Sequence, residues 1–251
     1  TIRNMSYLII GASSGLGRDL AYTFAEKKND LILVSRDEKD LTATKSDLEI
    51  KHKINVKILN FDYSSFKEIN SHLFSDQKLF QNLKGILFPI GHMYENDGID
   101  LDIEKIQSII FSNYLSTVYT VSKLKKILIL NQDTTIVGFG SISSLIGRQI
   151  NSNYAAAKRA LESYFESLAF EFKKSEINVQ FYMLGYLDTN LAFGKNLKLP
   201  KGSTKKLSKI VFNNRKTKYK KTYFPFFWIL ITFLLKIIPF SILLKLNKFL
   251  R

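Results

Sequence analysis

The chain has 251 residues, 45% of them hydrophobic, which is enough to bury the core of one α/β domain. It contains no cysteine and three histidines, so disulfides and thiolate metal sites are excluded and no metal centre is expected. The formal charge of +15 does not indicate nucleic acid, because residues 195–251 hold 15 Lys or Arg and no acidic residue, whereas residues 1–194 hold 22 of each sign.

Strand-sized apolar runs alternate with helix-length amphipathic segments over about 190 residues. This alternation predicts a doubly wound α/β fold in a single domain, with a parallel sheet covered by helices on both faces. The strand candidates are nearly continuous in apolar residues, as burial on both sides requires. The predicted strands are residues 7–11, 30–36, 55–62, 85–91, 134–141 and 177–185, and the predicted helices are residues 15–28, 37–52, 65–74, 102–128 and 152–174.

The character of the chain changes near residue 195. Residues 1–194 carry the alternating pattern. Residues 195–223 are basic and are expected to complete the domain with a short helix (203–213) and an edge strand (218–224). Residues 224–251 are apolar and basic and form the predicted C-terminal hydrophobic helical extension.

The first predicted strand leads into the turn "GASSGLG", which contains Gly11, Gly15 and Gly17 and precedes a helix. Glycines there permit a tight turn and a close backbone approach. The N-terminus of the following helix offers free N–H groups and the positive end of its dipole to a pyrophosphate. A dinucleotide is therefore the expected ligand, although turns before helices often contain glycine for other reasons. The loop residues expected to contact it are Gly11, Ser13, Ser14, Gly15, Leu16 and Gly17.

A second motif, "NYAAAK", occupies residues 153–158. Tyr154 and Lys158 are four positions apart, so they lie one turn apart on the same face of a helix. The three alanines between them have small side chains, so a neighbouring helix or a ligand can approach this face of the helix closely.

The spacing G-x-x-x-G-x-G followed by Y-A-A-A-K resembles the short-chain dehydrogenase/reductase family over residues 5–192. The resemblance implies a Rossmann fold and an NAD(P)-dependent carbonyl reductase. It also implies a catalytic tetrad of Asn113, Ser141, Tyr154 and Lys158, with Ser141 thirteen residues before Tyr154. Each of these residues also has a purely structural explanation when taken singly. Ser141 can cap the end of a strand, Asn113 can be a polar residue of a helix, and Tyr154 can be a half-buried packing residue.

Each member of this tetrad suits the reduction of a ketone. Hydride transfer leaves an alkoxide, which needs a proton donor and a hydrogen bond as charge develops. Tyr154 is the expected donor, and Lys158 is expected to lower its pKa from about 10 while holding the nicotinamide ribose. The resemblance assigns Ser141 to the carbonyl oxygen and Asn113 to a water that passes protons to Lys158.

The end of the second strand bears on the choice of cofactor. Ser35 and Arg36 lie there, and an arginine suits the 2′-phosphate of NADP, whereas a carboxylate would suit the ribose of NAD. NADP(H) is favoured and NAD(H) stays possible, since Arg36 and Asp37 can instead cap the next helix. The resemblance further places Asp62 beside the adenine and Thr189 on the nicotinamide carboxamide. It also implies that Gly91, Tyr154 and Lys158 contact the cofactor.

Three positions depart from the family pattern. Ile10 stands where Thr usually precedes the first glycine, Leu184 replaces a Pro, and "LFPIG" at residues 87–91 replaces N-A-G. Because Pro89 cannot donate a backbone hydrogen bond, we expect it at the end of the strand or at a bulge. None of the departures falls on the tetrad.

The C-terminal extension is too short to span a bilayer. Residues 223–235 and 237–244 are uncharged, but Lys236 separates them and Pro239 interrupts the second run, whereas a span needs about 20 apolar residues. A polar stripe opposite an apolar face predicts a helix that lies on an anionic membrane surface. The stripe consists of Ser241, Lys245, Lys248 and Arg251. A hydrophobic lid or a homo-oligomer surface is the alternative.

Similar basic, proline-split ends occur in some bacterial members of this family, including the reductase of polyprenyl-phosphoryl keto-pentose. The sequence therefore predicts a cytoplasmic carbonyl reductase, peripheral on the cytoplasmic face of a membrane, with a lipophilic or lipid-linked ketone or alcohol as substrate. A 3-keto acyl chain, a steroid-like ketone and a polyprenyl-linked keto-sugar all stay open. The alternative is a non-catalytic nucleotide-sensing or scaffold protein that retains the fold.

Overall fold

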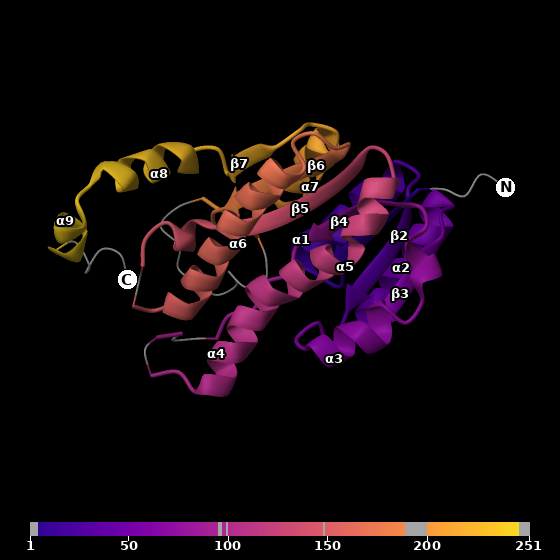
Figure 1. Cartoon of the computed structure of the whole chain (residues 1–251), viewed down its shortest axis with the longest axis horizontal. Helices are drawn as coiled ribbons and strands as arrows, with labels where there is room; N and C mark the ends of the chain where they lie inside the picture. The colour runs from indigo at the N-terminus through magenta and orange to yellow at the C-terminus, as the bar shows by residue number, and fades with distance from the viewer. Residues whose placement is uncertain (1–4, 95–96, 99, 148, 189–199, 246–251) are drawn as a thin grey trace.

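The computed structural model describes residues 5–94, 97–98, 100–147, 149–188 and 200–245. At its centre lies a seven-stranded sheet in the order β3-β2-β1-β4-β5-β6-β7, and every neighbouring pair is parallel (Figure 1). The strands are β1 (Ser6–Ile10), β2 (Asp30–Ser35), β3 (Val56–Asn60), β4 (Leu83–Phe88), β5 (Thr134–Ser141), β6 (Ile177–Leu184) and β7 (Lys220–Phe224). The predicted doubly wound sheet is confirmed. The strand order reverses between β1 and β4, the point at which such sheets bind ligands at their carboxyl ends.

Helices cover both faces of the sheet (Figure 1). One face carries α1 (Gly15–Glu26), α2 (Glu38–His52) and α7 (Thr204–Asn214), and the other carries α4 (Ile103–Ile110), α5 (Ser116–Leu130) and α6 (Ser152–Glu171). Successive strand residues point to opposite faces. Leu8 and Ile10 therefore join the core under α5 and α6, whereas Tyr7 and Ile9 join the core under α1 and α7. This two-sided burial explains the continuous apolar runs.

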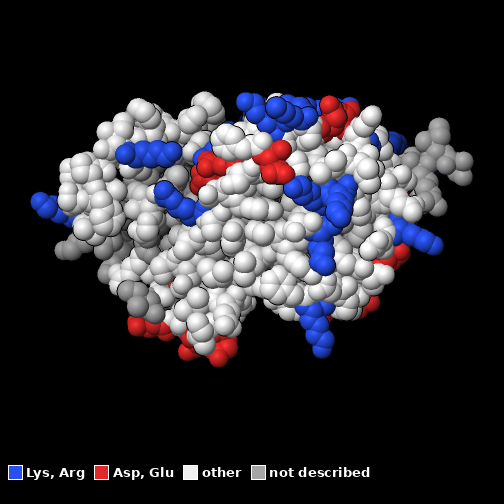
Figure 2. Space-filling model, viewed as in Figure 1, with Lys and Arg blue, Asp and Glu red and all other residues white. Residues whose placement is uncertain are grey.

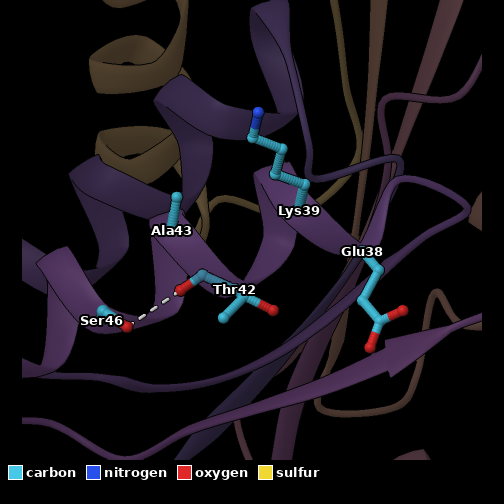
Figure 3. A pocket seen from close by; sticks show the side chains of 5 residues that line it. All are labelled: Glu38, Lys39, Thr42, Ala43 and Ser46. Atoms are coloured by element: carbon cyan, nitrogen blue, oxygen red, sulfur yellow. Dashed lines mark hydrogen bonds between the residues drawn. The ribbon is translucent and has the colours of Figure 1, made fainter.

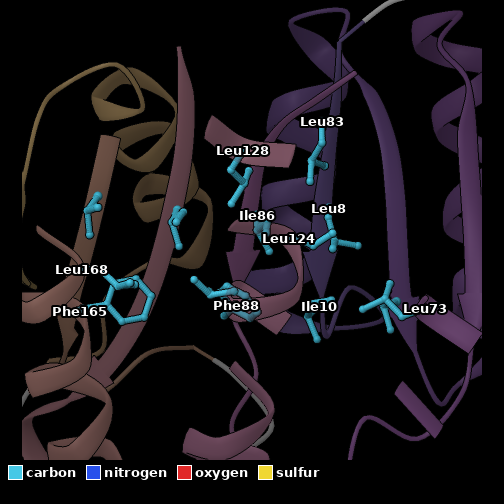
Figure 4. Close-up of a cluster of buried hydrophobic side chains, with 14 of the residues drawn as sticks. Leu8, Ile10, Leu73, Leu83, Ile86, Phe88, Leu124, Leu128, Phe165 and Leu168 are labelled. Atoms are coloured by element: carbon cyan, nitrogen blue, oxygen red, sulfur yellow. The ribbon is translucent and has the colours of Figure 1, made fainter. Parts of the chain in front are cut away.

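Figure 4 shows the core between the sheet and helices α5 and α6. Leu8, Ile86 and Phe88 from the strands lie near Leu124 and Phe165 from the helices. All five side chains are at most 1% exposed. This packing holds α6 against β4 and β5, whose carboxyl ends are part of the candidate site described below.

Two predicted helices are less regular than expected. Residues 65–74 form one turn, α3 (Phe66–Glu68), followed by a π-helical turn, η1 (Ile69–Leu73). The predicted helix 102–128 is interrupted by a second π-helical turn, η3 (Phe111–Leu115), between α4 and α5. Asn113 lies in the middle of this turn, and π-helical turns often occur at functional sites. Two 3₁₀ turns, η2 (Gln77–Phe80) and η4 (Ile142–Ser144), complete the connections.

Strand β4 ends at Phe88, so Pro89 follows its last residue. The prediction that Pro89 lies at the end of the strand is confirmed, since a proline within the ladder would lack the N–H that pairing requires.

In the described part of the basic segment, α7 packs on α1 and β7 runs parallel to β6, so the expected short helix and edge strand are both present. Beyond it, α8 (Trp228–Ile237) and α9 (Phe240–Lys245) extend past the sheet (Figure 1). Phe224 belongs to β7 and is 7% exposed, and Trp228 is 6% exposed, so both belong with the domain rather than with a free extension. No helix in the described part of the chain has the length and apolarity to cross a bilayer.

Candidate active site

The turn after β1 has the backbone geometry that its glycines suggest. Gly11 has φ +90° and Gly15 has φ +50°, a region that glycine adopts without strain. A Cβ on Gly17 would clash with the carbonyl oxygen of Gly11, so the third glycine lets α1 start directly against the turn. Ser14, the N-cap residue of α1, makes no side-chain cap hydrogen bond, and the first turn holds no acidic residue. The start of α1 therefore fits an anionic group such as a pyrophosphate.

Hydrogen bonds attach this turn to the end of β2. The backbone N–H groups of Gly11 and Ala12 donate to the carbonyl of Val34 at 2.8 and 3.1 Å. The Ser35 hydroxyl donates to the Ser13 hydroxyl at 2.8 Å, so these two predicted cofactor residues are brought together.

Arg18, in the first turn of α1, contacts this loop and was missed by sequence reasoning. Its guanidinium donates to the Ser13 carbonyl and pairs with Asp40 at 2.9 Å. Its position directly after the third glycine was the available signal.

Arg36 and Asp62 follow β2 and β3 on the same edge of the sheet. Both side chains are exposed, and within the described residues neither makes a hydrogen bond or an ion pair. The charges of both side chains affect the pKa of His92, which follows β4. Burial lowers the pKa of His92, the charge of Arg36 lowers it further, and Asp62 opposes them. The sequence did not single out His92, although it directly follows the predicted cofactor residue Gly91.

The side chain of Asn113 joins the π-helical turn η3 to the segment after β4. Its amide donates to the carbonyls of His92 at 2.6 Å and Ile109 at 2.9 Å, and its oxygen accepts from the His92 N–H at 3.2 Å. Asn113 is 1% exposed. Its side chain is thus engaged by protein groups, so we do not assign the predicted binding of a water to that side chain.

Lys158 is buried one helical turn beyond Tyr154. Its Nζ donates to the carbonyl of Ile90, after β4, at 3.0 Å and to that of Phe139, in β5, at 3.1 Å. The residue is 3% exposed, and burial lowers its pKa to about 7. Gly91 faces this group, because a Cβ there would lie 3.9 Å from the Lys158 Nζ and 3.7 Å from the Asn113 Oδ1.

Ser141 and Tyr154 meet between β5 and α6. Ser141 ends β5 and Tyr154 is the third residue of α6, and the Ser141 side chain lies close enough to the Tyr154 phenol to affect its pKa. Burial raises the pKa of Tyr154, and the Ser141 hydroxyl opposes that rise. The Lys158 Nζ lies 5.9 Å from the centre of the Tyr154 ring. The predicted lowering of the tyrosine pKa by Lys158 is therefore not seen, because burial dominates the titration of both groups.

The four predicted tetrad residues are thus brought together at the carboxyl ends of β4 and β5. Thr189 lies outside the described residues. A surface hollow of about 650 Å³ lies elsewhere and is lined by Glu38, Lys39, Thr42, Ala43 and Ser46, whose side chains Figure 3 shows along α2. All five side chains come from one helix, and none belongs to the predicted site. This surface hollow is therefore separate from the predicted site at the strand ends.

Comparison with known proteins identifies the family of the chain. Residues 6–199 match the profile of the short chain dehydrogenase family. The chain belongs to this family. Short-chain dehydrogenases are NAD(P)-dependent oxidoreductases, and their fold binds NAD(P)(H).

The curated relatives are longer than this chain. Dehydrogenase/reductase SDR family member 7B of Xenopus tropicalis is 30% identical over 192 residues, which cover 74% of this chain and 62% of the relative. Very-long-chain 3-oxoacyl-CoA reductase of Podospora anserina is 31% identical over 187 residues, which cover 72% of this chain and 54% of the relative. The chain thus spans between half and two thirds of the length of these short-chain dehydrogenases.

A solved structure of similar fold is the short-chain dehydrogenase from Sphingobium yanoikuyae in complex with NADPH. It has a TM-score of 0.76 and 22% identity, covering 86% of this chain and 87% of that one. The likeness shows the fold.

Proposed function

We propose that the protein is an NADPH-dependent reductase of a ketone carried by a lipophilic molecule. One observation carries the proposal. Tyr154 lies beside Ser141 at the carboxyl end of β5, one turn from a lysine that is buried against the ends of two strands. This cluster combines a proton donor, a second hydrogen-bonding hydroxyl and a titratable amine, which together fit carbonyl reduction.

Bound NADPH would supply the hydride to the carbonyl carbon. The Tyr154 hydroxyl donates a proton to the carbonyl oxygen, and the Ser141 hydroxyl hydrogen-bonds the same oxygen and orients it. The raised pKa of Tyr154 keeps the phenol protonated at neutral pH, which suits a proton donor. Lys158, with a pKa of about 7, exchanges protons near neutral pH and can return one towards Tyr154 after each turnover.

The contacts at the end of β2 favour NADPH over NADH. Asp37, the nearest carboxylate, accepts a hydrogen bond from the N–H of Asp40 at 2.9 Å and caps α2. Arg36 is exposed and makes no ion pair within the described part of the chain. An unpaired guanidinium beside a carboxylate that is already occupied suits a 2′-phosphate better than a ribose hydroxyl.

A lipophilic substrate is supported by the surface of α8 and α9. Most of their large apolar side chains are exposed: Ile229, Leu230, Phe233, Leu234, Ile237, Phe240, Ile242 and Leu244. In Figure 2 this end of the molecule is mostly uncharged, with isolated lysines. Two relatives are named for a very-long-chain 3-oxoacyl-CoA and for hydroxysteroid 11-beta-dehydrogenase. The very long acyl chain in the first name and the steroid in the second are apolar groups.

We propose that α8 and α9 hold the protein on an anionic membrane surface. Each large apolar side chain that is fully buried there contributes about 1.5–3 kcal/mol, and each basic side chain near anionic lipid contributes about 1 kcal/mol. Trp228, the first residue of α8, packs against Gly185 at the end of β6. Since Leu184 pairs with Ser141, the apolar surface starts next to the candidate site. A ketone dissolved in lipid would then approach the site from this side.

The reductase proposal is tested by following NADPH oxidation by the purified protein with ketones of several classes. The panel holds short- and long-chain 3-oxoacyl thioesters, a 3-ketosteroid and a polyprenyl-linked keto-sugar. We expect turnover with at least one long apolar substrate and none with Tyr154→Phe. Tight NADPH binding without reduction of any ketone would instead support a non-catalytic nucleotide-sensing protein.

The membrane proposal is tested by flotation with anionic and zwitterionic vesicles. Replacing Leu230 and Phe233 by serine should weaken binding strongly without unfolding, because both side chains are more than 60% exposed. The matched control replaces Leu130 and Phe170, which are 81% and 82% exposed but lie on α5 and α6. If the first pair leaves vesicle binding unchanged but dissociates an oligomer in gel filtration, the apolar surface is a contact between copies of the chain.

A further inference from the structure

The helix that carries Tyr154 and Lys158 is capped by a distant residue. Asn151, the N-cap residue of α6, makes no side-chain cap hydrogen bond. Instead the Ser152 N–H donates to the Asp97 carbonyl at 2.8 Å, and the Asn153 N–H donates to Oδ1 of Asp97 at 3.3 Å. The Tyr154 N–H donates to Oδ2 of Asp97 at 2.6 Å. One residue of the segment between β4 and α4 therefore accepts from the first three N–H groups of α6.

The Asp97 carboxylate has no countercharge within the described part of the chain. Asp97 is fully buried, and among the described residues no Lys, Arg or His pairs with it. The Asn153 amide adds a further hydrogen bond to Oδ1 at 2.7 Å. Hydrogen-bond donors and the positive end of α6 thus stabilise a carboxylate that would otherwise be costly to bury. A buried charge held in this way fixes the helix end, because the helix cannot move without leaving the charge unsatisfied.

We propose that Asp97 is a positioning residue that holds the Tyr154 hydroxyl at Ser141. The inference rests on the proposed function, because it concerns the proton donor of that reaction. Tyr154 lies in the first turn, and its own N–H is bonded to the carboxylate, so loss of Asp97 lets this turn fray. The Tyr154 hydroxyl then leaves its position beside Ser141 at the end of β5.

Lys158 should be much less affected by the same change. It lies one turn further along α6, and the carbonyls of Ile90 and Phe139 hold its Nζ independently of Asp97. Asp97 should therefore act on the chemical step and not on binding of the cofactor. A residue that only supported the fold would reduce both together.

The experiment measures kcat, KM and the NADPH dissociation constant for Asp97→Ala and Asp97→Asn in the full chain. A misplacement of about 1 Å in a reacting group costs about 100-fold in rate, so we expect that loss of kcat in Asp97→Ala, with NADPH affinity within about threefold. Asp97→Asn keeps one acceptor oxygen and should recover part of kcat. If the alanine variant does not fold, the isosteric asparagine variant carries the test, with a smaller loss of kcat at unchanged NADPH affinity.

A matched control and a second readout separate positioning from folding. Asp76 is an aspartate that caps another helical turn, accepting from the Lys78 N–H at 3.0 Å on the exposed surface, so Asp76→Ala should leave kcat unchanged. Amide hydrogen exchange should rise at residues 152–154 in Asp97→Ala and not in the control.

Two results would overturn the inference: unchanged exchange at residues 152–154, or a parallel loss of kcat and NADPH affinity. If the wild-type protein shows no turnover, the proposed function is refuted. A rise in exchange at residues 152–154 in Asp97→Ala would still support the role of Asp97 as the cap of α6.

Discussion

Burial of Lys158 should make the stability of the protein depend on pH. The pKa of Lys158 is lowered from 10.5 to about 7, and burial is the cause. Between these two values the unfolded chain carries a proton on this residue that the folded protein has released. Stability therefore rises with pH through this window and is penalised below it. At 1.36 kcal/mol for each pKa unit, the full penalty is about 5 kcal/mol.

Lys158→Met removes the titrating group while keeping a long, flexible side chain of similar volume. The measurement is urea unfolding of the wild type and the variant at pH 7 and pH 9. Linkage predicts that the difference in unfolding free energy moves in favour of the wild type by about 2 kcal/mol between these two values. Lys39→Met, at an exposed position on α2, controls for the loss of one positive charge.

A difference that stays constant between pH 7 and pH 9 would refute this reasoning. It would mean that the carbonyls of Ile90 and Phe139 compensate the ammonium fully and that burial does not control its titration. The proposed return of a proton from Lys158 to Tyr154 would then lose its support, since it needs a lysine that titrates near neutral pH.

Two further variants test the assigned roles. Tyr154→Phe should abolish NADPH oxidation, while NADPH affinity, measured by fluorescence titration, stays nearly constant. Residual activity of more than a few per cent would show that another group donates the proton. Arg36→Asp should weaken NADPH binding far more than NADH binding, because it replaces a phosphate-binding cation with a like charge. Equal losses for the two cofactors would leave Arg36 as a residue of the helix start only.

The sheet and the grouping of the four predicted site residues could be predicted because their signals are local. Each strand is an apolar run bounded by a turn, and the carboxyl ends of parallel strands lie at one edge of the sheet, so Ser141 and the glycine turn were expected at the same edge. The position of Tyr154 on the same helix face as Lys158 follows from the helical repeat alone. The family resemblance then supplied the sequence spacing between Ser141 and Tyr154.

The remaining features depend on contacts between distant segments. The break in the helix at 102–128 accompanies hydrogen bonds between Asn113 and His92, 21 residues apart, which no helical pattern reveals. Asp97 caps α6 by accepting from the Tyr154 N–H, although the two residues are 57 positions apart in the sequence. The pKa values of Tyr154 and Lys158 depend on how deeply both groups are buried. Spacing shows that the two are neighbours, but it does not show their burial.

The start of the exposed apolar extension also depends on a tertiary contact, between Trp228 and Gly185. A Cβ on Gly185 would overlap the indole ring, so Gly185→Ala should displace Trp228 and loosen the attachment of α8 beside β6. Trp228 is the single tryptophan of the sequence and is 6% exposed, so its fluorescence reports this change directly. We expect emission to shift to longer wavelength.

The same substitution separates attachment of α8 from membrane binding. The exposed apolar side chains of α8 and α9 are unchanged in Gly185→Ala, so vesicle binding should persist. Turnover of a substrate presented in vesicles should fall, because the lipid-bound helix no longer keeps a fixed position beside Ser141. Gly147→Ala is the control, since a Cβ there meets no atom within 4 Å. If Gly185→Ala shifts the emission but leaves vesicle-based turnover at the wild-type level, the position of α8 does not govern access to the site, and substrate enters by another route.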